Sequence, residues 1–337
     1  MLKIENILKN RTILMGISMI MIMIFHMNLP IINNNFIKRN LFIGVDMFLF
    51  YSGIGIYYSL KKNSNYKTFY KKRMIRILPT VLPVIIVGSF LLYYYRNDFG
   101  LKEFYYQISF LNFFTCSGNY LGFLWYIPAI ILFYVISPFL FKFIDKDKSS
   151  YNEIILLIGC VLLILITLPS NLFTYINSIS RLPIYIIGLA YGKKIYEKKE
   201  INKNYFMALI ILSVLAVFLV RYLENHSSMF TTAGVNICWI PITISISVLL
   251  SFIINKKRNM KLLEILTIIG NSTLAIYVLH EMLQYIIDAI VYYYHINIIL
   301  FTNNYYFSLI VGIITILISI FWTKIVEYNI KKISNQS

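Results

Sequence analysis

The sequence is divided into long apolar stretches that are separated by short basic loops. A helix needs about 20 apolar residues to cross the roughly 30 Å hydrocarbon core of a membrane. Stretches of about this length occur at 12–31, 42–60, 77–95, 121–141, 154–169, 182–196, 205–223, 233–254, 268–292 and 305–326. They predict an all-α integral membrane protein of about ten transmembrane helices, folded as a single transmembrane domain over residues 1–337.

The composition agrees with this prediction. Hydrophobic residues make up 59% of the 337 residues and charged residues only 13%, whereas soluble domains contain roughly a quarter charged residues. The net charge of +17 does not indicate a nucleic-acid partner, because the basic residues are scattered over the loops between apolar stretches. The three cysteines lack the spacing of a disulfide framework or a zinc site. We therefore expect membrane lipid around the chain and no bound metal.

The basic residues also predict the orientation of the chain. If the ten stretches alternate across the membrane, 25 of the 31 Lys and Arg residues fall on one side and 6 on the other. Basic residues concentrate on the cytoplasmic side of membrane proteins, so we expect cytoplasmic termini and a multi-pass protein of the cell membrane. The apolar stretch 104–116 is too short to span and would spoil this alternation, so it is interpreted as an interfacial or re-entrant segment.

Two ionisable side chains lie near the predicted outer ends of the first two helices. His26 ends an apolar run, and Asp46 lies within the segment 44–48. Ionisable groups inside a span are costly unless a cavity or a partner receives them. Their similar depth makes a histidine–carboxylate pair possible, in which Asp46 orients the ring of a general base. The alternative is that each side chain simply reaches the membrane interface.

The ninth predicted helix carries a polar stripe. His280, Gln284 and Asp288 recur at intervals of four residues and share one face, with Tyr277 close by, whereas Glu281 is rotated by about 100° from His280. Such a stripe cannot face lipid, so we expect it to line a cavity. The alternative is hydrogen bonding between packed helices.

The loop from residue 61 to residue 76 contains seven basic residues and no acidic residue, and it ends with Arg73 and Arg76. A basic loop of this kind is ordinary on the cytoplasmic side of a membrane. It also suits a ligand that carries phosphate groups, because an arginine side chain can bind phosphate oxygens through two parallel hydrogen bonds.

Six short motifs follow one another along the chain. They are Met15–Ile17 through His26, Gly44–Phe48 with Ser52–Gly53, Arg73 with Arg76 and Pro79, Leu124–Tyr126 with Tyr134 and Pro138, Arg181 with Pro183, Gly188 and Gly192, and Ser272 with Leu274, Tyr277 and His280. In this order they resemble the membrane acyltransferase-3 family, whose better-known members O-acetylate cell-surface carbohydrates.

The resemblance implies a membrane O-acyltransferase that uses acetyl-CoA, or another short acyl thioester of coenzyme A, as its donor substrate. Arg73 and Arg76 match the basic loop of the family and are expected to bind the donor. The family usually has a basic residue eleven positions before its histidine, where this chain has Met15. Arg11 is the nearest base, one turn earlier, and is the candidate replacement, although about 22 Å of helix separates it from His26.

The implied acceptor is a hydroxyl group of a capsule, exopolysaccharide, cell-wall or lipid-linked carbohydrate. His26 is expected to act as the general base with help from Asp46, and Tyr277 and His280 to position groups or stabilise an oxyanion. An acetyl-histidine intermediate is chemically possible as well. A transporter or flippase for a lipid-linked sugar is the alternative, since it would also need a polar cavity and basic loops. A non-catalytic assembly subunit would not need His26.

Overall fold

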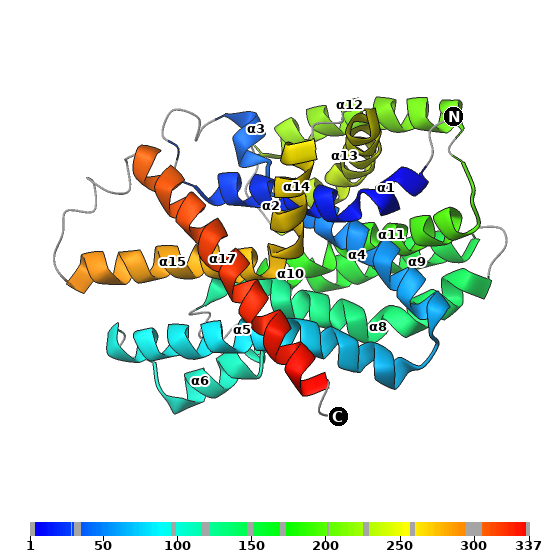
Figure 1. The fold of residues 1–337 in the computed structure, drawn as a ribbon. Helices are drawn as coiled ribbons and strands as arrows, with labels where there is room; N and C mark the ends of the chain where they lie inside the picture. Colours follow the sequence, from blue (N-terminus) through cyan, green and yellow to red (C-terminus); the bar gives the residue numbers. More distant parts are fainter. Residues whose placement is uncertain are drawn as a thin grey trace.

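The structure is a computed structural model that describes residues 4–27, 29, 35–95, 99–115, 121–146, 151–168, 173–200, 202–224, 229–256, 260–293 and 305–334. Every regular element in these ranges is a helix (Figure 1). The all-α fold predicted from the sequence is therefore confirmed.

Each predicted span overlaps at least one helix, although several boundaries differ. The main helices are α2 (Arg11–His26), α4 (Ile43–Lys62), α5 (Tyr66–Tyr95), α8 (Tyr126–Lys146), α9 (Tyr151–Thr167), α11 (Leu182–Tyr196), α12 (Lys203–Glu224), α13 (Met229–Lys256), α15 (Thr273–Tyr293) and α17 (Tyr305–Ser334). The shorter elements are α1 (Glu5–Lys9), α3 (Phe36–Arg39), α6 (Leu101–Ile108), α7 (Asn112–Thr115), η1 (Gly122–Trp125), α10 (Phe173–Ile179) and α14 (Met260–Asn271). Within the predicted stretch 104–116, residues 104–108 belong to α6 and residues 112–115 form α7.

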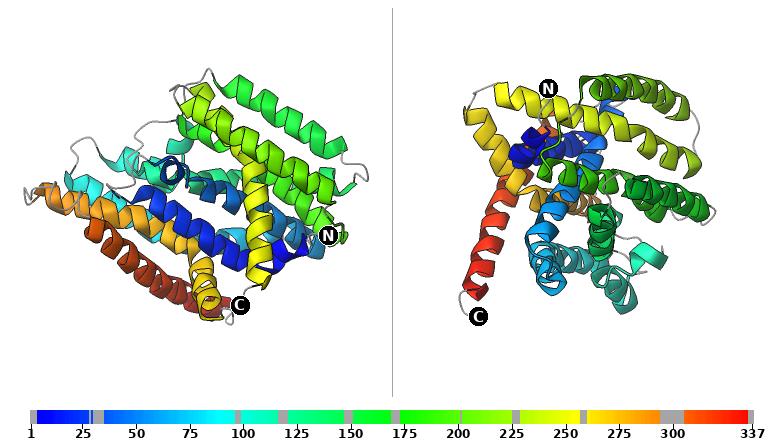
Figure 2. Two further views of the ribbon diagram at one scale, coloured as in Figure 1. Left: turned by 90° about the horizontal axis from the view of Figure 1, so that it is seen from above. Right: turned by 90° about the vertical axis from the view of Figure 1, so that its right-hand side faces the viewer.

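Six helices in the described ranges are long and apolar enough to cross a membrane, or seven if the bent pair α14–α15 counts as one span. The number of ten spans and the cytoplasmic termini stay predictions. Figures 1 and 2 place α12 and α17 at the outside of the bundle. Only 17% and 22% of their apolar stretches are buried. Such wide apolar surfaces require lipid rather than water, so the fold is that of a multi-pass membrane protein.

The predicted span 268–292 is not one straight helix, because α14 and α15 meet at Ser272 with a bend of 73°. Before the bend, α14 packs closely on α2. A Cβ atom added at Gly270 would collide with the carbonyl oxygen of Thr12, and one added at Gly16 would collide with that of Leu266. These two glycines let the backbones of α2 and α14 approach closely. The chain then turns, and α15 runs past the far end of α2 (Figure 1).

A second glycine-mediated contact joins α4 and α11. A Cβ atom at Gly53 would collide with the carbonyl oxygen of Tyr185, and one at Gly188 would collide with that of Phe50. Small residues at such positions are the usual means of close helix packing in membranes. The contact buries most of α4 and brings Asp46 in α4 beside Arg181, the residue that precedes the first residue of α11.

Candidate active site

Two cavities lie along α2. The first, here called the histidine cavity, has a volume of about 460 Å³ and includes His26, Glu281, Arg181 and Trp125 in its lining. The second, here called the arginine cavity, is narrow, with a volume of about 70 Å³, and is lined by residues that include Arg11 and Arg76. The cavities occupy opposite ends of the same helix.

His26 ends α2, and its ring points to a carboxylate on α15. The Nδ1 atom of His26 lies 2.5 Å from Oε1 of Glu281, and Nε2 of His280 lies 3.3 Å from the same oxygen. The rings of His26 and His280 are 5.1 Å apart. His26 is partly exposed and Glu281 half-buried, so both can be reached from the histidine cavity. A carboxylate that accepts a hydrogen bond from Nδ1 leaves Nε2 of His26 free to take a proton.

The predicted pairing of His26 with Asp46 is wrong. Asp46 instead forms an ion pair with Arg181, whose Nε lies 2.9 Å from Oδ1 of the carboxylate. Both side chains are buried. The two residues belong to motifs that lie far apart in the sequence, and the packing of α4 against α11 brings them together. Asp46 therefore cannot orient the ring of His26 directly.

Aromatic rings and hydrogen-bond acceptors surround the guanidinium group of Arg181. Its guanidinium carbon lies 5.6 Å from the ring centre of Phe42 and 5.5 Å from that of Trp125. Nη1 donates a hydrogen bond of 2.9 Å to the backbone carbonyl of Asn177 and also contacts the Asn177 side-chain oxygen. A buried charge requires such partners. The ion pair with Asp46 thus fixes the wall of the histidine cavity.

The rest of this wall offers hydrogen-bonding groups. Nδ2 of Asn236 donates to Oγ of Ser180 at 2.7 Å and to Oδ1 of Asn177 at 3.2 Å. Glu224, which also lines the cavity, accepts hydrogen bonds from Arg39 at 3.0 Å and from Asn40 at 2.5 Å. A cavity that combines amide and carboxylate groups with aromatic rings suits a polar ligand with flat or ring-shaped apolar faces.

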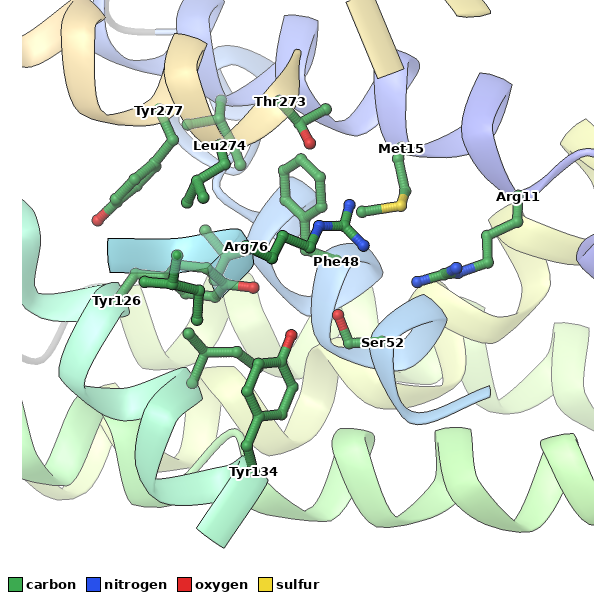
Figure 3. Close-up of a pocket in the computed structure, with 14 residues that line it drawn as sticks. Arg11, Met15, Phe48, Ser52, Arg76, Tyr126, Tyr134, Thr273, Leu274 and Tyr277 are labelled. Carbon is green, nitrogen blue, oxygen red and sulfur yellow. The ribbon is translucent and has the colours of Figure 1, made fainter. Parts of the chain in front are cut away.

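In the arginine cavity, Arg11 and Arg76 point their guanidinium groups toward each other beside Met15 (Figure 3). Nε of Arg11 donates a hydrogen bond of 2.9 Å to the backbone carbonyl of Tyr51. A Cβ atom at Gly55 would lie only 2.7 Å from the guanidinium carbon of Arg11. The side chain is therefore held against α4, and Arg11 reaches the same cavity that Met15 lines.

Arg73, the third arginine in the set expected to bind the donor, lies beside this cavity rather than in its lining. Its guanidinium carbon is 5.3 Å from the ring centre of Phe69 and 5.5 Å from that of Tyr134, and Tyr134 does line the cavity. Within the described ranges, no carboxylate forms an ion pair with Arg11, Arg73 or Arg76. Positive charge without acidic partners favours binding of an anion.

Tyr277 connects the two cavities. Ile22, Val45 and Tyr277 line both of them. The ring of Tyr277 lies 5.3 Å from that of Tyr126 and 5.9 Å from that of His280. The side chains of Gln284 and Asp288, which complete the predicted polar stripe, lie outside the described residues. The stripe therefore reaches the site through Tyr277 and His280.

Glu281 is the residue that sequence reasoning missed. Glu281 is rotated by about 100° from His280 along the helix, so the predicted stripe of His280, Gln284 and Asp288 does not include it. The bend at Ser272 sends α15 past the end of α2, so that two adjacent residues of α15, His280 and Glu281, both face His26. The available signal was an acidic residue inside an apolar span, which marks a functional candidate whatever its helical phase.

The fold and the site define a helical membrane protein in which one cavity rich in arginine adjoins another that contains a histidine–carboxylate cluster. The family model described as an acyltransferase domain, that of the acyltransferase-3 family, matches residues 13–323, nearly the whole chain. The chain therefore belongs to this family and is a membrane acyltransferase. Neither the comparison with curated proteins nor that with solved structures gives a match.

Proposed function

We propose that this protein transfers an acetyl or other short acyl group from a coenzyme A thioester to a hydroxyl group of a cell-surface or lipid-linked carbohydrate. The observation that carries the proposal is the junction of two unlike cavities along α2. One presents Arg11 and Arg76 without acidic partners, and the other presents His26 with Glu281. An enzyme that transfers an acyl group from a phosphorylated donor to a neutral hydroxyl needs a basic site for the donor and a general base for the hydroxyl.

The donor binds in the arginine cavity. Its phosphate groups pair with Arg11 and Arg76, and Arg73 adds positive charge from beside the cavity. The acyl end extends toward Ile22, Val45 and Tyr277, where the two cavities meet. Arg11 and His26 lie at opposite ends of α2, about 22 Å apart, so the donor has to be long. A thioester at the end of a flexible arm meets this requirement.

The acceptor binds in the histidine cavity. The amide groups of Asn177 and Asn236 and the carboxylate of Glu224 offer hydrogen bonds to hydroxyl groups, and the rings of Trp125 and Phe173 offer flat apolar surfaces. Carbohydrates combine these two needs, because their hydroxyl groups require partners while one face of the sugar ring is apolar.

The reaction then follows from the orientation of His26. Nε2 removes the proton from the acceptor hydroxyl as its oxygen attacks the thioester carbonyl, and Glu281 holds the ring through Nδ1. The tetrahedral intermediate collapses, the carbon–sulfur bond breaks, and the proton on Nε2 passes to the leaving thiolate. The products are the O-acyl acceptor and free coenzyme A.

Tyr277 and His280 serve this step in different ways. Tyr277 lies where the cavities meet and is the candidate to contact the thioester carbonyl. His280 is buried beside Glu281, and its Nδ1 lies 3.0 Å from the carbonyl oxygen of Ile276. It acts through Glu281 and is a positioning residue.

The experiment that tests the proposal uses purified protein in detergent with acetyl-CoA. We expect free coenzyme A to be released only when a carbohydrate acceptor is added, with one acylated acceptor formed for each thiol released. The matched control is His26→Gln at equal protein concentration. Movement of a lipid-linked sugar across vesicles without any acyl transfer would support the flippase alternative and overturn the proposal.

A further inference from the structure

Three side chains that can ligate a metal ion converge at the end of the histidine cavity. One ring nitrogen of His26, one of His280 and a carboxylate oxygen of Glu281 all lie within 4.8 Å of one another. Nδ1 of His26 and Nε2 of His280 are the nitrogens in contact with Oε1 of Glu281. Two imidazole nitrogens and one carboxylate form a ligand set that binds Zn²⁺ and related ions in proteins. His26 and Glu281 line the cavity, so an ion and its water ligand can enter from that side.

The hydrogen bonding of the two ring nitrogens of His280 is a second, independent observation. Its Nδ1 lies 3.0 Å from the carbonyl oxygen of Ile276. Because a carbonyl group only accepts hydrogen bonds, Nδ1 must carry the ring proton. In the neutral ring, Nε2 is then unprotonated and carries a lone pair. This atom is buried without a well-directed hydrogen bond, in a residue that is only 8% exposed, and it faces Oε1 of Glu281 at 3.3 Å. A lone pair that faces a carboxylate oxygen needs a cation or a proton between them.

One of the three separations already fits a small tetrahedral ion, and the other two require movement of His26. Zinc–ligand bonds of 2.0–2.2 Å at tetrahedral angles place neighbouring ligand atoms about 3.4 Å apart. The distance between His280 and Glu281 already has this value, at 3.3 Å. His26 has to move outward from its 2.5 Å contact with Glu281. Its position at the end of α2, where the side chain is partly exposed, allows this movement.

We propose that His26, His280 and Glu281 bind a divalent transition metal ion such as Zn²⁺, with the fourth position open to the histidine cavity. Hard ions such as Mg²⁺ prefer all-oxygen ligands and should not compete. The expectation from the sequence that the chain binds no metal rested on cysteine and histidine spacing. That spacing could not reveal a site whose two histidines lie on α2 and α15.

Metal binding has a consequence that rests on the proposed function. A metal ion on Nδ1 of His26 requires the proton of the neutral ring to sit on Nε2. That nitrogen can then no longer accept a proton from the acceptor hydroxyl. Occupation of the site therefore inhibits acyl transfer, and it does so reversibly because no bond in the protein is broken.

The binding test uses Co²⁺ as a spectroscopic probe on the purified full chain in detergent. We expect one tightly bound ion for each chain, visible absorption bands typical of four-coordinate cobalt, and displacement by Zn²⁺ but not by Mg²⁺. Glu281→Gln and His280→Gln should each weaken binding by at least about tenfold. His226→Gln, which also removes one histidine, is the matched control and should bind as the wild type does. Equal Co²⁺ binding in all of these variants would overturn the site.

The inhibition test is separate and follows the acylated acceptor, because the thiol of free coenzyme A also binds Zn²⁺. We expect Zn²⁺ to inhibit transfer over the same concentration range in which it displaces Co²⁺, and a chelator to restore full activity. Failure of acyl transfer in every condition would count against the proposed function while the Co²⁺ spectra still decide the metal site. Full activity at saturating Zn²⁺ would overturn the inhibitory role.

Discussion

His26 at the end of α2 and Glu281 in α15 are joined by a 2.5 Å contact between Nδ1 and a carboxylate oxygen. This contact decides which ring nitrogen can accept a proton, because a proton held on Nδ1 leaves Nε2 as the acceptor. The contact also gives the three residues of the site different roles. His26 can touch the substrate, Glu281 acts through His26, and His280 lies beside Glu281 in the interior.

The first prediction concerns His26. Glutamine keeps the approximate size and the hydrogen bonding of histidine but cannot take a proton near neutral pH. His26→Gln should accumulate in the membrane normally and transfer the acyl group about 10²–10⁴ times more slowly. The measurement is acyl transfer for each unit of membrane-inserted protein. Turnover close to that of the wild type would rule out His26 as the base.

The second prediction concerns Glu281. Glu281→Gln removes the negative charge that stabilises the imidazolium but retains a hydrogen-bond acceptor. We expect kcat to fall by at least about tenfold while KM for the acceptor changes little. Glu281→Asp restores the carboxylate on a shorter arm and should recover part of the rate. A rise in KM alone would instead show that Glu281 binds the acceptor.

The third prediction concerns the pair of Asp46 and Arg181. Asp46→Asn leaves Arg181 as a buried charge without its partner, which costs about 3–5 kcal/mol. The variant should therefore unfold at a lower temperature and accumulate less. The double variant Asp46→Asn with Arg181→Gln removes both charges and should recover part of the lost stability. Thermal unfolding in detergent measures this effect, and normal stability of Asp46→Asn would contradict the structural role.

The fourth prediction concerns the arginine cavity. Arg11→Gln and Arg76→Gln should each remove a charge-assisted contact to phosphate, worth about 1.5–3 kcal/mol. Apparent affinity for the donor should therefore fall at least about tenfold, with KM for the acceptor unchanged. Met15 lines the same cavity, so Met15→Arg in the Arg11→Gln background should restore part of the donor affinity. Unchanged donor affinity in both single variants would contradict binding of the donor in the arginine cavity.

The fifth prediction concerns orientation and rests on the distribution of 25 and 6 basic residues. Cysteines placed at Ser64 and Lys199 should be protected from an impermeant thiol reagent in intact cells. One at Asn303, which lies outside the described residues, should react. Permeabilised cells provide the control, because all three positions should then be labelled. Labelling at Lys199 in intact cells would contradict the arrangement of ten spans.

The sequence by itself determined the class of fold, the places of the helices and many of the residues that form the site. The length of an apolar stretch is a local property, because each helix satisfies its own backbone hydrogen bonds and crosses the lipid as a separate unit. His26, Asp46 and His280 stood out for the same local reason, because a polar group in an apolar span needs an explanation. The motif order added the family, which the match over residues 13–323 confirmed.

Only the tertiary structure decided which of these residues meet. Asp46 seemed the natural partner of His26 because both lie at similar depth, but depth does not specify rotation about a helix axis. The close packing of α4 on α11 turns Asp46 to Arg181, and the bend at Ser272 carries Glu281 to His26. Pairing across helices depends on packing angles and kinks that arise from contacts between distant segments. Such contacts leave no local pattern in the sequence of either helix.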